Sequence, residues 1–535
     1  MIYALLLLLL FIFGNLIGIP DAPFPQGDEI MHIRSVRESL SSGNYIIPTL
    51  SSLPNPYKPP LLFWMGMATD KIFGISYASE RLVSVSFGIG ILILLYKLVF
   101  HIGKSRGEAL LTTILFGYTF FSLKFFGLLM METAMAFFLL FYFFTFYFYK
   151  KTKQPRYLIL GSIISGIGYL LKGPILHVYI LLFLFSYFYV EVVKIRNGKL
   201  SFLWKKIQKE RFIIFSFGIT FIIPSIWILF LYFTIPSGKD LLRFFFITEN
   251  IGKFYSANQS AIRIWFGWIL YTIPFTIPLI HLIGNIIRIH KPTKHKNYVM
   301  VLLIYFILVT SVHLLPNRKD PYYLTPFISF LFLLPSMHNI TWKSLLLSKA
   351  NQISNLIIYF VLSLIAVVLR LPYLFAITII LILYLSNALF FLQNKNSQWR
   401  AVFISQIFIV PCIIFLLIQP ISDPDLRDLT KEAQHSSICV VIENPWTAMD
   451  VQNKLENSTV IFSLPLTIAE KCSQANYLIN FVGVEIPNDF TKLKTWSRWN
   501  QHMQLNFNLF STSNFKFDQR KFKTEISFWK RGEPI

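Results

Sequence analysis

The sequence is poor in acidic residues, in cysteine and in charge overall. Its 535 residues include 26 Asp and Glu against 49 Lys and Arg, and only 14% of the chain is charged. A soluble protein of this length could not cover an apolar content of 55% with so few charges, so the composition excludes a water-soluble globular protein. Of the three cysteines, Cys412 lies in an apolar run, whereas Cys439 and Cys472 are able to pair if the C-terminal tail is extracytoplasmic.

Long apolar runs are what the chain has in quantity. Runs of about 18 to 22 residues recur, and as helices they are long enough to cross a hydrocarbon core of about 30 Å. The sequence therefore predicts an α-helical polytopic membrane protein with about thirteen spans. They are expected at residues 2–20, 79–101, 108–128, 131–149, 157–172, 174–192, 211–235, 263–289, 298–315, 322–336, 354–370, 372–391 and 401–419.

The loops between these spans carry an orientation signal. Basic residues gather in alternate loops, which is the positive-inside pattern, so much of the net charge of +23 marks topology rather than nucleic-acid binding. The pattern predicts a cytoplasmic N-terminus, with the 21–77 loop and the C-terminus outside. The first twenty residues lack a charged n-region and a small-residue cleavage site, so we expect a retained helix. The basic loop 193–210 is expected to face anionic lipid headgroups inside.

The composition changes at about residue 420. Charged residues become frequent, and short β-rich runs appear at 438–442, 459–462 and 477–482, with a helical segment at 447–455. We therefore predict two domains. Residues 1–419 would form a transmembrane catalytic domain whose outer catalytic loop spans about 21–77, and residues 420–535 a small extracytoplasmic α/β domain.

An acidic pair opens an amphipathic segment in the 21–77 loop. Residues 28–40 place Ile30, Ile33, Val36 and Leu40 near one helical face, which is typical of a helix lying in the membrane interface. Asp28 would then cap the helix, and Glu29 would interact with the helix dipole. A cap needs only one carboxylate, however. A partly desolvated carboxylate at this surface is also suited to act as a general base or to stabilise developing positive charge.

A stiff cationic stretch follows about thirty residues later. Lys58 precedes Pro59-Pro60 and follows Tyr57, and a residue before proline is held in an extended conformation. Such rigid placement suits a cation that must meet a phosphate. The alternative is a lysine that snorkels to the membrane interface.

More charges lie at other predicted outer ends of spans. An unpaired Glu132 carboxylate at membrane depth would cost free energy, so it needs a partner or a function. Lys172 has an alternative explanation as a helix-dipole partner. The positive-inside rule disfavours Arg318 in an outer loop, so it also needs a reason. Acids and bases that converge beside lipid suit a lipid-phosphate substrate. The cations would hold the phosphate, and the acids would handle a nucleophile or an oxocarbenium-like charge. The set comprises Glu132, Lys172, Glu249, Lys253, Arg318 and Tyr323.

The ordered set of motifs resembles the aminoarabinose-to-lipid A transferases and the wider bacterial branch of the protein O-mannosyltransferase superfamily, which are integral-membrane C-type (GT-C) glycosyltransferases. The order and spacing match over residues 1 to about 340. The motifs are Gly27-Asp28-Glu29, Lys58-Pro59-Pro60-Leu61, Met131-Glu132-Thr133, Leu171-Lys172-Gly173-Pro174, Glu249-Asn250-Ile251-Gly252-Lys253-Phe254 and Lys319-Asp320-Pro321-Tyr322-Tyr323.

The resemblance implies inverting transfer of a sugar from a polyprenyl monophosphate donor on the outer face of a bacterial inner membrane. The acceptor would be a lipid A-like lipid, another envelope glycan or a protein. By position, the resemblance makes Asp28 the catalytic carboxylate, with Glu29 beside it, and Glu132 a second acid. Lys58, Lys253 and Tyr323 are expected at the donor phosphate, together with Arg318. Further site residues would be Lys172, Glu249 and Tyr57.

The chain departs from the family pattern at three positions. Tyr57 stands where an acid is common, so a metal contact from that acid is in doubt and no divalent metal or other cofactor is predicted. This chain has Glu132 where the family commonly has aspartate. It has Lys253 where the family often has arginine, and a lysine cannot form the bidentate contact of a guanidinium. Two other classes stay open. The chain could be a transporter or flippase of lipid-linked sugars, or an inactive scaffold whose C-terminal domain binds envelope partners.

Overall fold

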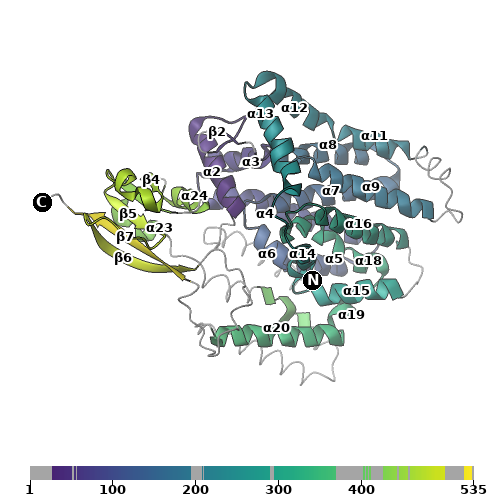
Figure 1. The fold of residues 1–535 in the computed structure, drawn as a ribbon. Helices are drawn as coiled ribbons and strands as arrows, with labels where there is room; N and C mark the ends of the chain where they lie inside the picture. The colour runs from purple at the N-terminus through teal and green to yellow at the C-terminus, as the bar shows by residue number, and fades with distance from the viewer. Residues whose placement is uncertain are drawn as a thin grey trace. The chain divides into compact units, whose positions relative to one another are not determined.

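The computed structural model describes most of the chain as two compact units (Figure 1). The membrane unit contains Ser35–Val361 and part of Ala376–Cys412, and the C-terminal unit contains Pro23–Arg34 and Ile413–Ile535, with a further short segment at Leu362–Phe375. The described residues are 27–50, 53–55, 57–193, 208, 210–288, 295–368, 402–403, 405–407, 409–410, 426–442, 445–455, 458–499 and 523–532. The predicted spans at 2–20 and 372–391, most of the 193–210 loop and the domain boundary at 419/420 lie outside them.

The membrane unit is helical. Among the described residues, four helical segments are long and apolar enough to cross a membrane, or five if one sharply bent pair counts as a span. This confirms a polytopic helical membrane protein, while the number of thirteen spans stays a prediction. The four are α4 (Tyr77–His101), α7 (Met131–Thr152), the segment made of α11 (Arg211–Ile219) and α12 (Ile222–Thr234), and α16 (Lys296–Leu314).

Shorter elements complete the described part of this unit. Its other helices are α3 (Leu61–Phe73), α5 (Arg106–Gly117), α6 (Phe120–Phe125), α8 (Pro155–Lys172), α9 (Ile175–Val193), α13 (Gly238–Arg243), α14 (Ile262–Thr272), α15 (Thr276–Arg288), α17 (Ile328–Leu331), α18 (Leu334–His338), α19 (Trp342–Leu346) and α20 (Lys349–Val368). A π-helical turn η1 (Phe244–Asn250) and the 3-10 helices η2 (Ile251–Phe254) and η3 (Pro321–Phe327) lie between them, and β1 (Thr49–Leu50) pairs with β2 (Leu53–Pro54).

Several predicted spans are broken rather than continuous, and two of them show the cause. The run at 263–289 forms α14 and α15, which are bent by 108° at a break that contains Pro274. Proline has no N–H group to donate to the helix and its ring clashes with the preceding turn. The run at 108–128 forms α5 and α6, because the Thr119 side chain accepts a hydrogen bond from the Ser122 backbone and starts a new helix. A hydropathy pattern does not reveal either break, since both lie inside runs that are apolar on average.

The helix predicted at 28–40 forms as α2 (Gly27–Ser42). Side chains in its second half contact other elements of the membrane unit. The Ser35 hydroxyl donates to the Thr49 carbonyl, a Cβ on Gly66 of α3 would come within 2.7 Å of Val36, and Arg37 pairs with Glu80 of α4. These contacts fix the helix against the membrane unit, and its place in the membrane interface stays a prediction.

Helices α7 and α8 pack closely side by side, and this packing positions part of the site. A Cβ added at Gly161 of α8 would lie 2.1 Å from the Thr145 hydroxyl of α7, so only glycine allows this approach. The two helices are antiparallel neighbours joined by a short turn. The start of α7 therefore lies beside the end of α8, and these two positions carry Glu132 and Lys172.

The C-terminal unit contains a five-stranded sheet of order β4-β3-β5-β7-β6. Strands β3 (Ser437–Val441), β4 (Thr459–Ser463) and β5 (Tyr477–Asn480) are parallel, and β7 (Lys523–Arg531) runs antiparallel to β5 and to β6 (Phe490–Trp499). Helix α24 (Pro445–Lys454) connects β3 to β4. The smaller elements are α23 (Leu426–Leu429), η6 (Lys431–Ala433), η7 (Pro465–Thr467) and α25 (Ile468–Lys471). The fold prediction of a small α/β domain is confirmed.

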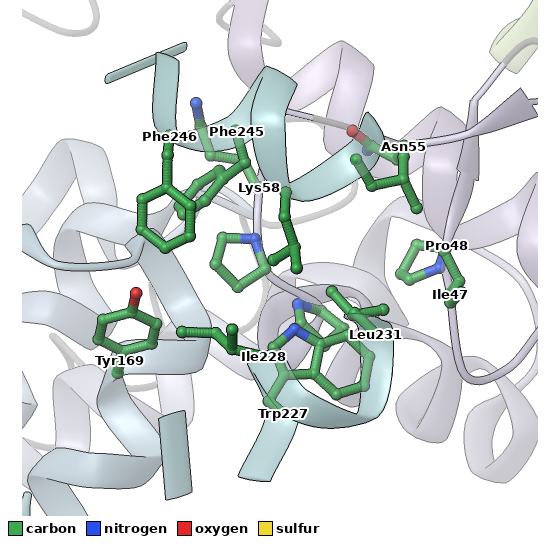
Figure 2. A pocket seen from close by; sticks show the side chains of 14 residues that line it. Ile47, Pro48, Asn55, Lys58, Tyr169, Trp227, Ile228, Leu231, Phe245 and Phe246 are labelled. Atoms are coloured by element: carbon green, nitrogen blue, oxygen red, sulfur yellow. The ribbon is translucent and has the colours of Figure 1, made fainter. Parts of the chain in front are cut away.

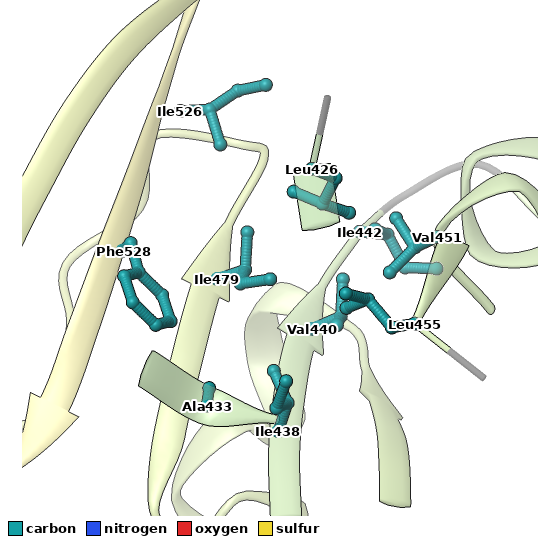
Figure 3. Close-up of a cluster of buried hydrophobic side chains, with 10 residues drawn as sticks. All are labelled: Leu426, Ala433, Ile438, Val440, Ile442, Val451, Leu455, Ile479, Ile526 and Phe528. Atoms are coloured by element: carbon teal, nitrogen blue, oxygen red, sulfur yellow. The ribbon is translucent and has the colours of Figure 1, made fainter. Parts of the chain in front are cut away.

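An apolar core lies on one side of this sheet. Figure 3 shows Val440 of β3, Ile479 of β5 and Phe528 of β7 with side chains from α23 and α24, all of them buried. Cys439 and Cys472 form a disulfide, so the pairing considered from the sequence is present. The strands at 438–442, 459–462 and 477–482 were predicted from their β-branched runs, whereas β6 and β7 were not.

Candidate active site

Two lysines from distant parts of the chain meet at one carboxylate. Glu249 Oε1 accepts from Lys58 Nζ and lies 3.2 Å from Lys253 Nζ. Lys58 comes from the stretch before α3, and the other two residues come from η1 and η2. The structure thus brings together three of the residues selected from the sequence. We call them the two-lysine cluster.

The local backbone holds this cluster in register. Glu249 lies in the π-helical turn η1. Such turns are rare in proteins, and those that occur are often found at functional sites. The Asn250 side chain donates to the Phe245 carbonyl at 2.6 Å and stabilises this turn. The Tyr57 ring packs edge-on against Phe244, with ring centroids 5.4 Å apart, and so holds the segment that carries Lys58 against η1.

The electrostatics of the cluster favour an incoming anion. Two ammonium groups share one carboxylate, so the cluster carries a net positive charge. Burial raises the pKa of the Glu249 carboxyl, but the charges of Lys58 and Lys253 outweigh burial and leave the pKa below its ordinary value. Burial, followed by the charge of Lys58, lowers the pKa of Lys253 to about 8. Another negative group would relieve the repulsion between the two lysines.

An apolar cavity begins at Lys58 (Figure 2). It encloses about 510 Å³ of space, part of it open to solvent, and Lys58 is the one charged residue among the 14 that line it. The wall includes Tyr169 of α8, Trp227 and Leu231 of α12, and Phe245 of η1. A cavity with a cation at its edge and apolar walls suits a molecule with an anionic head and a hydrocarbon chain.

A second charged pair joins the start of α7 to the end of α8. Lys172 Nζ donates to Glu132 Oε1 at 2.8 Å, and it also lies 5.7 and 5.6 Å from the ring centroids of Tyr322 and Tyr323. Among the described residues, Glu132 Oε2 is buried and has no hydrogen-bond partner. The charge of Lys172 also lowers the pKa of Lys253, so this pair lies within electrostatic reach of the two-lysine cluster.

The turn before η3 is tied to η2 through backbone hydrogen bonds. The Asn317 and Arg318 amides donate to the Lys253 carbonyl at 3.1 and 3.3 Å. Arg318 Nε donates to Asp320 at 2.8 Å, and Arg263 also contacts Asp320, so the Arg318 guanidinium has a carboxylate partner. The turn therefore brings the Arg318 backbone close to Lys253, while the roles of Arg318 and Tyr323 at the donor phosphate stay predictions.

Asp28 and Glu29 occupy the first turn of α2, in the C-terminal unit. Asp28 is half-buried and Glu29 is buried. Their catalytic role stays a prediction, because the residues that would surround the donor phosphate belong to the membrane unit. In the parts of the chain that the structure describes, no group of three or more His, Cys, Asp or Glu side chains is arranged to hold a metal ion.

Sequence reasoning missed His313 of α16. This histidine is buried, its Nε2 lies 2.8 Å from the Tyr179 hydroxyl, and its ring centroid lies 5.4 Å from that of Tyr323. The His313 ring therefore packs against the Tyr323 ring. A lone histidine inside an apolar run was the available signal, because ionisable residues in spans are rare and often functional.

Comparison with known proteins shows which fold the chain shares. Residues 44–241 match the family model of the dolichyl-phosphate-mannose-protein mannosyltransferases. The structure superposes on ArnT from Cupriavidus metallidurans bound to undecaprenyl phosphate with a TM-score of 0.66, over 98% of this chain and 97% of that one, at 13% identity. The apo form of that ArnT gives a TM-score of 0.64. The chain has the ArnT fold.

Two curated proteins are similar in sequence to parts of this chain. The chain is 24% identical, over 334 residues, to the undecaprenyl phosphate-alpha-4-amino-4-deoxy-L-arabinose arabinosyl transferase of Photorhabdus laumondii. An uncharacterized protein of Aquifex aeolicus is 35% identical over 107 residues. The aligned regions cover 60% and 20% of this chain, and 57% and 24% of those two relatives. The predicted resemblance to ArnT and the mannosyltransferase superfamily is therefore confirmed.

Proposed function

We propose that the protein is a membrane glycosyltransferase that transfers a sugar from a polyprenyl-phosphate donor to an envelope acceptor. The acceptor is a lipid A-like lipid, a glycan or a protein. The reaction takes place on the outer face of a bacterial inner membrane. The proposal rests on one observation above all: Lys58 and Lys253 converge on a single carboxylate at the edge of an apolar cavity.

The geometry fits both halves of such a donor. The cavity walls from α8, α12 and η1 suit the first isoprene units of a polyprenyl chain, because they are apolar and Lys58 stands at their margin. The phosphate would take its place between the two lysines, with Tyr323 and Lys172 on the side of the sugar. Each charge-assisted hydrogen bond to phosphate contributes about 1.5–3 kcal/mol.

The chemistry assigned to the site is an inverting displacement. An acceptor oxygen attacks the anomeric carbon, the bond from that carbon to the phosphate oxygen breaks, and the polyprenyl monophosphate leaves with the electron pair. Lys58 and Lys253 stabilise the charge that develops on the leaving phosphate. Asp28 takes the proton of an acceptor hydroxyl, while a phosphate acceptor is already anionic and needs mainly positioning. Glu132, through its buried second oxygen, stabilises positive charge on the sugar ring.

The orientation belongs to the same proposal. Basic residues in alternate loops favour a cytoplasmic N-terminus and an external site. The disulfide between Cys439 and Cys472 favours a C-terminal unit outside the reducing cytoplasm, where disulfides persist.

The test compares envelope lipids and glycoproteins from cells that make the wild-type protein, the Asp28→Asn variant or no protein. Mass spectrometry should find one added sugar on one acceptor class in wild-type cells only. Equal amounts of the two proteins in the membrane serve as the control. A product that persists with Asp28→Asn would contradict the assignment of the base, and identical envelopes in all three strains would contradict the transfer reaction.

A further inference from the structure

The carboxylate at the centre of the two-lysine cluster stands where an anionic substrate would need to bind. Lys58 and Lys253 both direct their ammonium groups to Glu249 Oε1. A phosphate oxygen bound by both lysines would need the same place, because the two cations converge there. Phosphate bound between the two lysines would therefore compete with the ion pairs of Glu249.

We infer, on the basis of the proposed function, that Glu249 is an internal competitor for the donor-phosphate site. Its carboxylate occupies the position between Lys58 and Lys253 in the empty protein and leaves when phosphate arrives. After transfer it returns and helps to expel the product. Glu249 is thus a specificity-determining residue that discriminates between lipids by the charge of their headgroups.

The charge difference between donor and product gives this competitor its selectivity. A polyprenyl-phosphate sugar is a phosphodiester with one negative charge, whereas the released polyprenyl phosphate is a monoester whose second pKa is about 6, so it is mostly dianionic at neutral pH. The displaced carboxylate stays on the same turn, next to the bound headgroup, and the remaining repulsion between the two grows with the charge of the ligand. Glu249 therefore weakens binding of the product more strongly than binding of the donor.

The surroundings of Glu249 allow it to move. The exposed fractions of the Lys58, Glu249 and Lys253 side chains are 14%, 17% and 26%, so the cluster opens to solvent. Both lysines keep the pKa of the Glu249 carboxyl low, and it stays ionised when it is displaced into water. The π-helical turn that carries Glu249 is also a conformation with looser hydrogen bonding than an α-helix.

The test measures binding of two lipids that differ only in headgroup charge. Undecaprenyl phosphate is the monoester, and its methyl phosphodiester stands in for the donor without any assumption about the sugar. Both are titrated at pH 7.5 against the full-length protein in detergent. For Glu249→Gln we expect about tenfold tighter binding of the diester and about a hundredfold tighter binding of the monoester. Asp240→Asn removes an exposed carboxylate from the same predicted outer loop and should change both affinities less than about twofold.

Equal shifts for both lipids, or none, in Glu249→Gln would overturn the inference. If that variant does not fold, the wild-type protein gives the answer through carboxyl labelling. Excess water-soluble carbodiimide and an amine should modify Glu249 several-fold faster, by peptide mass spectrometry, when undecaprenyl phosphate saturates the protein. Unchanged labelling would also overturn it. Wild-type protein that binds neither lipid would instead refute the proposed function itself.

Discussion

Two ion clusters in the membrane unit have similar components and opposite designs. Arg37 and Glu80 form a bidentate pair with distances of 2.7 and 3.1 Å, and their side chains are only 7% and 0% exposed. In the two-lysine cluster, two flexible lysine side chains share one carboxylate oxygen of Glu249, and all three side chains stay partly exposed. The first pair is balanced and closed, which is typical of a structural link. The second has excess positive charge and an open side, which is typical of a binding site.

The surroundings of the two clusters differ in the same way. The Arg37 guanidinium lies 4.7 Å from the centre of the Tyr77 ring, and the pair joins α2 to α4 inside the protein. Lys58, by contrast, lines a cavity. Charge placed in a rigid arginine fork favours one fixed partner, while charge on two lysine stems adapts to a partner that changes during a reaction.

The largest effect should come from breaking the closed pair. Arg37→Met would remove the guanidinium that donates two hydrogen bonds to the buried Glu80 carboxylate, and breaking such a buried pair costs about 3–5 kcal/mol in the free energy of unfolding. The thermal midpoint of the purified protein in detergent should fall by several degrees. Glu38→Gln, on the half-buried flank of the same helix, is the control and should change the midpoint little. An unchanged thermal midpoint in Arg37→Met would contradict the structural role of the pair.

Breaking the open cluster should affect turnover instead. Lys58→Met removes a cation from the leaving phosphate, and kcat/KM should fall on the order of 100- to 1,000-fold. The thermal midpoint should hardly change, because Glu249 keeps Lys253 as its partner. A Lys58→Met protein that unfolds as readily as Arg37→Met, or that keeps full activity, would erase the distinction between the two clusters.

The pH dependence tests which charge the open cluster needs. Lys253 has a pKa of about 8, so its charge is present below that pH and is lost above it. We expect kcat/KM to fall about tenfold per pH unit above pH 8, since this parameter reports the free enzyme. Lys253→Arg should remove this fall because arginine stays charged. The same alkaline fall in Lys253→Arg would show that another group titrates.

The smallest expected effect concerns metals. No metal is assigned to the transfer, since Tyr57 occupies the place of an acid that is common in the family. Dialysis against a chelator should therefore leave activity within about twofold. Loss of activity that returns on addition of a divalent cation would refute this prediction and would require ligands beyond the two-lysine cluster.

The sequence predicted the class of fold because apolar length and charge spacing are direct consequences of the bilayer. It did not predict the 108° bend between α14 and α15 or helix α3, since hydropathy does not register where the chain turns. Lys58, Glu249 and Lys253 were each selected from motifs. Their meeting across 191 residues depends on packing that no local pattern contains. The Arg37–Glu80 pair was missed for the same reason.

The most direct test of the central claim is transfer by purified protein in detergent micelles, without a sealed membrane. Radiolabelled polyprenyl-phosphate sugars and envelope acceptors are incubated with wild type, Asp28→Asn and Lys58→Met. We predict that wild type releases polyprenyl monophosphate and labels an acceptor in equal amounts, that Lys58→Met does so far more slowly, and that Asp28→Asn does neither. Folded wild-type protein that moves labelled lipid across vesicles but never cleaves the sugar–phosphate bond would contradict this account and identify a transporter.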